Sequence, residues 1–186
     1  MELTPEVVLP ALRGRFGRPY YYAAETTSTQ TMPPPDAPHG AVALAEHQTA
    51  GRGRLGRVWL DEPGAGLTFS VVLHPPRPVS RWPELTLLAA HAVAAAVGAG
   101  ATIKEPNDVL LDGGKVAGVL AEATERVVLG IGVNVGAAPW PGAAAARADR
   151  LALLVAILEQ LERRYEGWLA TGPSRRAPGA GRVTDR

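Results

Sequence analysis

The sequence predicts an α+β fold that is built around a central sheet. Short apolar runs of strand length recur along the chain, and two of them flank Asp112-Gly113-Gly114, which is a strong hairpin signal. A long segment near the C-terminus instead repeats its apolar residues at helical spacing. The 186 residues are 46% hydrophobic and 20% charged, a balance typical of one globular domain with a substantial core.

The first half of the chain alternates strand-like runs with loops. Thr4 and Pro5 are residue types that begin a helix, which we expect to reach about Arg13, although Pro10 weakens it. We expect strands over residues 20–24, 41–46 and 67–73, with a proline-rich loop over 32–40 between the first two.

The second half contains two longer helices and the hairpin. The segment Trp82-Pro83-Glu84 opens a long helix that runs to about Val97, where Gly98 or Gly100 stops it. Further strands are expected over 101–104, 109–111, 116–122 and 127–135, followed by a loop over 137–148 and an amphipathic helix over 149–169. The Gly-, Pro- and Arg-rich residues 171–186 are expected to form a flexible tail.

The composition excludes several kinds of site and partner. There is no cysteine, and no two of the four histidines have metal-ligand spacing, so neither disulfides nor a structural metal site is expected. A net charge of +1 gives no reason to expect nucleic acid as a partner. The acidic, proline-broken N-terminus is unlike a signal peptide, and the apolar stretch 85–101 is too short to span a membrane. We therefore expect a cytoplasmic protein.

The most informative segment is the loop from Gln48 to Trp59, in which glycines alternate with Arg52, Arg54 and Arg57. Glycines let backbone amides turn toward an anion, and guanidinium groups supply forked donors with fixed charge. A loop of this kind after a buried strand favours a phosphate cradle that closes over its ligand. A nucleic-acid-binding Arg-Gly segment or a plain surface loop is an equally open interpretation of the loop taken alone. It is not a Walker loop, because Gly-Lys-Ser/Thr is absent.

Lys115 and Asp108 are the next candidates. Lys115 begins the second hairpin strand and is one of two lysines in an arginine-rich chain, which indicates that a compact point charge is needed there. In isolation, a lysine that keeps a hairpin edge soluble is the simpler interpretation. Asp108, next to Asn107, is suited to bind magnesium or to orient Lys115, and equally suited to form a turn.

Polar residues and glycines mark two further segments. Ser28, Thr29 and Gln30 offer hydroxyl and amide partners to a ligand, and they can also cap a helix. Gly130 and Gly132 lie among β-branched residues, which indicates that a ligand approaches the sheet closely there, although Gly-x-Gly alone is a weak signal.

Taken in order, five blocks resemble the catalytic domain of the biotin protein ligases. They are Ser28-Thr29-Gln30, the loop 48–59, Lys104-Glu105-Pro106-Asn107-Asp108-Val109, the segment 114–122 and the segment 130–135. No block is specific by itself, but their order and spacing match the family over roughly residues 20 to 170.

The resemblance implies a central mixed, mostly antiparallel sheet flanked by helices, as in lipoate ligases and the cores of class II aminoacyl-tRNA synthetases. It implies ATP and biotin as substrates, Mg²⁺ as a cofactor, and transfer of biotin through biotinyl-5'-AMP to a lysine of a biotin carboxyl carrier protein. It further implies a catalytic domain over 1–170, with 171–186 as a vestige of a C-terminal barrel. A homodimer and a single-function ligase without a DNA-binding domain are also expected.

The resemblance also assigns roles to individual residues, by matching position. Catalytic roles fall to Lys115 and Arg54. Biotin-binding roles fall to Ser28, Thr29, Gln30, Gln48, Gly51, Arg52, Gly53, Arg54, Lys115 and Gly118. Nucleotide-binding roles fall to Arg54, Arg57, Trp59, Asn107, Lys115 and Asn134, and a metal-binding role falls to Asp108.

The sequence departs from the family in two places. The family usually has tryptophan where this chain has Glu105, and a carboxylate beside an anion site is costly unless it faces solvent or pairs with an arginine. The small barrel expected after the last helix is also largely missing, and residues 178–183 are interpreted as a vestige of its first strand.

Three other functions stay open on the sequence alone. A lipoate-type ligase shares the fold and the lysine, although the Gly-Arg loop favours biotin. A biotin- or adenylate-binding protein with impaired transfer is consistent with Glu105 and the short C-terminus. A nucleic-acid-binding module rests on the arginine loop alone, against a net charge of +1 and an aromatic content of 5%.

Overall fold

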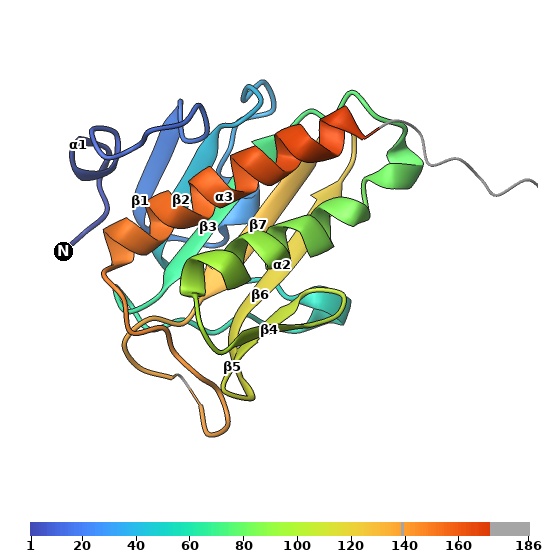
Figure 1. The fold of residues 1–186 in the computed structure, drawn as a ribbon. Helices are drawn as coiled ribbons and strands as arrows, with labels where there is room; N and C mark the ends of the chain where they lie inside the picture. The colour runs from blue at the N-terminus through green and yellow to red at the C-terminus, as the bar shows by residue number, and fades with distance from the viewer. Residues whose placement is uncertain (139, 172–186) are drawn as a thin grey trace, which may run out of the picture.

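The computed structural model describes residues 1–138 and 140–171. Seven strands form one sheet in the order β1-β2-β3-β7-β6-β5-β4 (Figure 1). β1 and β2 are parallel, and every other pair of neighbours is antiparallel, so the predicted mixed, mostly antiparallel sheet is confirmed. The strands are β1 (Tyr20–Thr26), β2 (Val42–Gln48), β3 (Leu67–Leu73), β4 (Ala101–Lys104), β5 (Asp108–Leu111), β6 (Gly114–Ala123) and β7 (Val127–Val133). The predicted tail lies, from residue 172 onward, outside the described residues.

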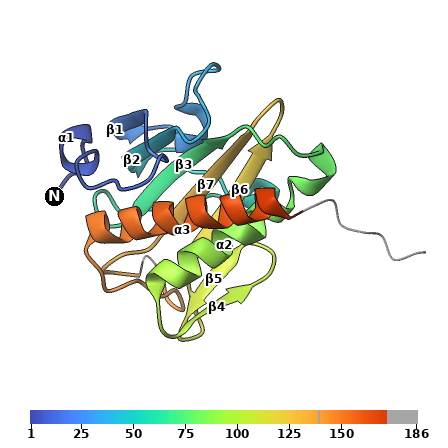
Figure 2. The ribbon, with the colours of Figure 1, turned by 45° about the horizontal axis from the view of Figure 1, so that its top comes forward.

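Two long helices, α2 (Glu84–Val97) and α3 (Arg150–Ala170), lie side by side across one face of the sheet (Figures 1 and 2). The Asp149 side chain caps α3 by accepting from the Ala152 N–H at 2.9 Å, and Gly98 ends α2 with a φ of 94°. The N-terminal helix α1 covers only Pro5–Val8, shorter than expected, because Pro10 has no N–H to continue the pattern. None of the described helices combines the length and hydropathy needed to cross a bilayer.

Side chains alternate between the two faces of the central strands, and this alternation positions the site. In β3 and β7, the odd-numbered residues are large and apolar, and they are buried in the core with residues of α2 and α3. Four of the even-numbered residues on the same strands, Thr68, Ser70, Gly130 and Gly132, are small or polar. Across the ladder, Thr68 pairs with Gly132 and Ser70 pairs with Gly130. The face turned away from the helices therefore has room for a ligand.

The hairpin between β5 and β6 brings Asp108 and Lys115 to the same side of this sheet. Its turn residues Asp112 and Gly113 have positive φ angles of 50° and 84°, as the predicted hairpin signal requires. A register shift between Val109 and Leu110 then pairs Leu110 with Lys115. Lys115 and Asp108 thus come close although they lie on different strands.

A buried carboxylate fastens the N-terminal segment to α3. Both oxygens of Glu162 accept from the Arg15 N–H at 2.9 and 3.1 Å, and one also accepts from the Phe16 N–H at 3.3 Å. Gly14 passes so close that a Cβ there would lie 2.0 Å from Glu162 Oε2. Glu162 therefore satisfies backbone donors that would otherwise be buried without a partner.

We expect Glu162→Ala to lower the free energy of unfolding by about 2–3 kcal/mol, because it orphans the two backbone N–H groups. The matched control is Glu166→Ala on the same helix, whose side chain is 53% exposed and also pairs with Arg15. That exposed pair should contribute at most about 1 kcal/mol. Urea unfolding of the three proteins measures both values, and equal losses would contradict the assignment.

Candidate active site

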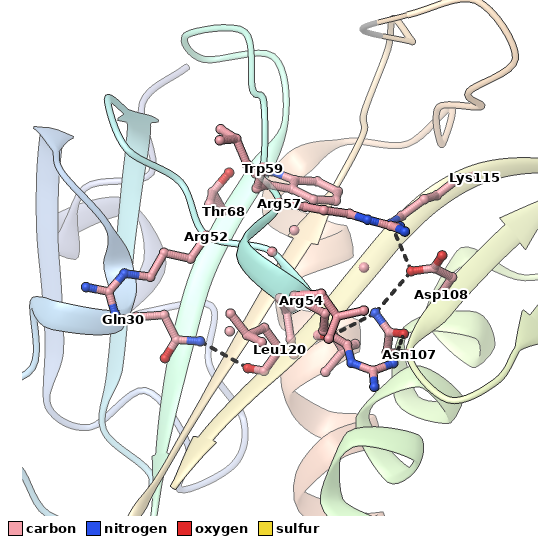
Figure 3. A pocket seen from close by; sticks show the side chains of 18 of the residues that line it. Gln30, Arg52, Arg54, Arg57, Trp59, Thr68, Asn107, Asp108, Lys115 and Leu120 are labelled. Atoms are coloured by element: carbon pink, nitrogen blue, oxygen red, sulfur yellow. Dashed lines mark hydrogen bonds and ion pairs between the residues drawn. The ribbon is translucent and has the colours of Figure 1, made fainter.

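A cavity of about 580 Å³ opens on the sheet face that the helices leave uncovered. Its floor comes from the even-numbered residues of three adjacent strands: Thr68 of β3, Gly118 and Leu120 of β6, and Gly130 and Gly132 of β7. The 48–59 loop and the segment 104–108 form its sides (Figure 3). This volume lies within the range of about 300–1,000 Å³ that is usual for small-molecule sites.

One polar network joins the two sides of the cavity (Figure 3). Lys115 Nζ lies 2.8 Å from Asp108 Oδ1, which also accepts from the Asn107 side-chain amide at 3.1 Å. Asn107 Oδ1 in turn accepts from Arg54 Nη1 at 2.9 Å, so the loop is tied to the hairpin. Asp108 therefore orients Lys115, one of the roles open to it from the sequence, and it does so through a direct ion pair.

The Trp59 ring lies over two of the three glycines of the floor, Gly118 and Gly132. A Cβ on Gly132 would lie 2.3 Å from Trp59 Cε2, and one on Gly118 would lie 3.1 Å from Trp59 Cζ3. Lys115 Nζ is 5.7 Å from the centroid of the same ring, within range of a cation–π interaction. The sequence predicts that a ligand approaches the sheet at Gly130 and Gly132. In the structure the close approach at Gly132 is made by the indole of the loop itself.

The loop is a small hairpin, which we call the flap (residues 51–59). The Trp59 N–H donates to Gly51 O at 3.0 Å, and the Gly53 N–H donates to Arg57 O at 2.7 Å. Its tip has the form of a type I′ turn, since Leu55 and Gly56 have φ angles of 57° and 73°. A leucine in this left-handed conformation costs roughly 1–2 kcal/mol.

Polar side chains at the ends of β1, β2 and β3 form the opposite end of the cavity. Ser28 accepts from the Gln30 N–H at 3.4 Å, so its predicted capping role is confirmed in a short 3₁₀ helix, Thr29–Thr31. Gln48 Oε1 accepts from the Thr29 N–H at 2.7 Å, and the Thr29 hydroxyl lies 2.8 Å from that of Ser70. Both Ser28 and Gln48 also line the cavity.

Gln30 packs against the sheet at the same end of the cavity as Ser28 and Gln48. Its side-chain Nε2 donates to Leu120 O at 3.0 Å and occupies the space that a Cβ on Gly130 would need, 2.4 Å away. Its Oε1 is buried and has no hydrogen-bond partner among the described residues. An unsatisfied buried acceptor at a cavity is suited to receive an N–H from a ligand.

Asp61 closes the base of the flap. Its Oδ2 accepts from the Gln48 N–H at 3.1 Å and lies 3.5 Å from His47 Nδ1, so the residues just before and after the flap are held together. The side chain is only 5% exposed. Burial raises the pKa of Asp61, because the charged form is poorly solvated there, and the hydrogen bond from Gln48 opposes this change.

Most of the predicted site residues meet at this cavity, and two do not line it. Gly51 is the first residue of the flap, and a Cβ there would come 2.4 Å from Trp59 O. Asn134 is 5% exposed, and its amide donates to Lys115 O at 3.2 Å and to Ala144 O at 2.9 Å. In the structure Asn134 thus supports the backbone that carries Lys115. The cavity lining includes Ser28, Thr29, Gln30, Gln48, Arg52, Gly53, Arg54, Arg57, Trp59, Asn107, Asp108, Lys115 and Gly118.

Arg52 reaches the rim of the cavity, and its guanidinium pairs with Glu122 of β6 at 3.1 Å. Glu105, which stands where the family usually has tryptophan, is an exposed residue on the cavity wall. Solvent access removes most of the cost expected of a carboxylate beside an anion site.

Several residues that build the site are not found by the sequence reasoning. Thr68 and Ser70 could have been found, because they are polar residues at alternate positions of an otherwise apolar strand and so share one face of the sheet. Asp61 has no such sequence signal, since it acts through Gln48 and His47, which only the fold brings near. The assembled site gathers the cations Lys115, Arg54 and Arg57 around a glycine and indole floor. Such a cavity can hold an anion that carries an apolar body.

The chain is similar in sequence to known proteins. Residues 22–136 match the Biotin/lipoate A/B protein ligase family. The chain is 38% identical over 160 residues to the bifunctional ligase/repressor BirA of Bacillus subtilis, a match that covers 74% of this chain and 49% of that protein. It is 41% identical over 152 residues to the biotin--[acetyl-CoA-carboxylase] ligase of Mycobacterium tuberculosis, covering 72% of this chain and 57% of that protein.

The fold agrees as well. The biotin protein ligase from Aquifex aeolicus in complex with biotin and ATP superposes with a TM-score of 0.71 and 30% identity, over 79% of this chain and 70% of that one. The chain spans about half the length of the curated relatives it matches. Because the family match covers more than half of the chain, and the fold agrees with it, the chain belongs to the Biotin/lipoate A/B protein ligase family.

Proposed function

We propose that this protein activates biotin with ATP to biotinyl-5'-AMP and transfers biotin to a lysine of a biotin carboxyl carrier protein. The observation that carries the proposal is the convergence of Lys115 and Arg54 on one cavity, through the network of Asp108 and Asn107. Relatives named as biotin ligases, and the A. aeolicus protein that was solved with biotin and ATP, support biotin and ATP as substrates.

The two ends of the cavity suit the two ends of biotin. The ureido group carries N–H donors and a carbonyl acceptor, which match the hydroxyls and amides of Ser28, Thr29 and Gln30. The apolar rings and chain would lie along the glycine floor, beside Trp59. The carboxylate would then reach Lys115, where cations can hold it against the nucleotide.

The first step joins two anions, so its main barrier is electrostatic. A biotin carboxylate oxygen attacks the α-phosphorus of ATP, the bond to the bridging oxygen breaks, and pyrophosphate leaves. Lys115 and Arg54 offset the charge that builds on the phosphoryl oxygens, an effect of about 3–4 kcal/mol per well-placed donor. Arg57, Trp59 and Asn107 would contact the nucleotide, and Asn134 would act through the Lys115 backbone.

ATP is expected to enter as its magnesium complex. Magnesium commonly binds through one or two protein carboxylates together with substrate phosphates and water, and Asp108 offers one such carboxylate at the cavity. Asp108 would help to hold the ion, and its Oδ1 also accepts from Lys115 and Asn107. The ion would supply positive charge to the phosphates, and Asp108 would keep Lys115 in place.

In the second step, the neutral amine of the acceptor lysine attacks the acyl carbon of the mixed anhydride. The bond from that carbon to the phosphate oxygen breaks, AMP leaves, and the nitrogen loses a proton as the amide forms. The flap must exclude water until the lysine arrives, because water would hydrolyse the anhydride. We place the reaction in the cytoplasm, where ATP is available, and we expect a homodimer through the sheet edges β1 or β4.

Biotin and ATP give the direct test. Calorimetric titration should show one biotin site, and adding MgATP should release pyrophosphate in an amount equal to the enzyme. Biotin binding without pyrophosphate release would identify a binding protein instead. Pyrophosphate release with lipoate and none with biotin would assign the chain to the lipoate side of the family.

We expect Lys115→Ala and Arg54→Ala each to lower the rate of adenylate formation at least about 100-fold, because each removes a donor to the developing charge. The readout is single-turnover pyrophosphate release at saturating biotin. Arg13→Ala is the control, since that side chain is 84% exposed and lies outside the cavity. A Lys115→Ala protein with the wild-type rate would refute the role of Lys115.

Asp61 should act through the flap. Asp61→Ala leaves the Gln48 N–H unpaired, so we expect trypsin to cut the native protein after Arg52, Arg54 or Arg57 about tenfold faster. Asp61→Asn keeps an oxygen acceptor and removes a poorly solvated charge, and it should cleave at the wild-type rate. Mass spectrometry of the first fragments measures both rates. Equal cleavage of all three proteins would show that Asp61 does not hold the flap.

A further inference from the structure

Exposed apolar side chains are concentrated on the flap and the residue that follows it. Among the described residues, the large hydrophobic side chains that are exposed are Met1, Leu55, Val58, Leu60 and Val79. Three of these lie between residues 55 and 60, with exposed fractions of 88%, 65% and 60%. Single exposed hydrophobic residues need no explanation, but a cluster beside a ligand cavity does.

Leu55 is an unfavourable choice for its position. It is the first central residue of a type I′ turn, where glycine, asparagine or aspartate adopts the required positive φ at much lower cost. Its side chain also gains nothing from burial, because most of it is in solvent. A residue that is both strained and exposed contributes little to the stability of the isolated chain. Its role therefore lies in contact with another molecule.

The flap is held where such a contact would matter. Arg54, next to Leu55, donates to Asn107 across the cavity, and Trp59 rests on the sheet floor (Figure 3). The apolar tip therefore stands at the mouth of the cavity. A lysine side chain extends only roughly 6 Å beyond its Cα, given its bond lengths. Any protein that inserts a lysine here must bring its backbone against the flap.

We propose that Leu55, together with Val58 and Leu60, forms the docking surface for the lysine-bearing acceptor protein. This inference rests on the proposed function. The partner is a folded protein with an exposed lysine flanked by apolar side chains, which cover the flap residues when the amine reaches the acyl carbon. The contact delivers the acceptor and plays no part in forming the adenylate. Leu55 is thus a specificity residue for the second step.

The test separates delivery of the acceptor from the chemistry. The full chain is first loaded with biotinyl-5'-AMP, and two nucleophiles are then compared in single turnover. One is the biotin carboxyl carrier domain of a bacterial acetyl-CoA carboxylase, and the other is hydroxylamine, which needs no docking. For Leu55→Asn, we expect the ratio of the carrier rate constant to the hydroxylamine rate constant to fall about tenfold. Asparagine is chosen because it adopts the positive φ of this turn at lower cost than leucine, so the fold is not weakened.

The control is Val79→Asn, which removes another exposed hydrophobic side chain (65% exposed) outside the flap and should leave the ratio unchanged. An unchanged ratio in Leu55→Asn, or a parallel fall with both nucleophiles, overturns the docking surface while leaving the ligase function intact. If the wild-type chain makes no adenylate, the proposed function fails and the docking surface fails with it. If Leu55→Asn changes the sedimentation of the free protein and not the ratio, the surface belongs to a second copy of this chain.

Discussion

The ion pair between Lys115 and Asp108 is the contact on which the site depends. It holds the ammonium over the cavity and, through Asn107, extends to Arg54 on the flap. Both side chains of the pair are partly exposed, at 32% and 23%, so solvent limits its strength and an incoming anion can compete for the ammonium. An anionic ligand can therefore bind the Lys115 ammonium in place of an Asp108 carboxylate oxygen, and the lysine need not move far.

The sheet serves stability and ligand binding with the same strands. In β3 and β7 the odd-numbered residues fill the core under α2 and α3, whereas Thr68, Gly130 and Gly132 on the opposite face contribute to the cavity floor. Because side chains alternate strictly along a strand, a slip of one residue would exchange the two sets. The large core residues, such as Phe69 and Ile131, thus fix the register that turns Gly130 and Gly132 toward the cavity, where Gln30 and Trp59 pack on them. The packing of the core on the helix-covered face therefore determines which residues face the cavity on the opposite face.

Much of the fold could be predicted from local patterns. Strand 67–73 and strand 101–104 have the predicted bounds, and the hairpin at Asp112-Gly113 follows from turn chemistry alone. Sequence also brought Ser28, Gln48 and Lys115 together as one expected site, through the order of the motif blocks. It could not find Asp61 or the support that Asn134 gives to Lys115, because those roles depend on partners that are distant in sequence. A local pattern contains no information about such pairs.

The Trp59 indole packs on Gly118 and Gly132, so the residues allowed in the flap and in the sheet constrain each other. Neither glycine adopts a left-handed backbone, so local conformation alone would tolerate alanine at both positions. The constraint comes from the ring above them: one added methyl group on the sheet would lift a loop that belongs to another stretch of sequence. These two strand positions and the aromatic residue therefore have to change together in any descendant that keeps the loop lowered.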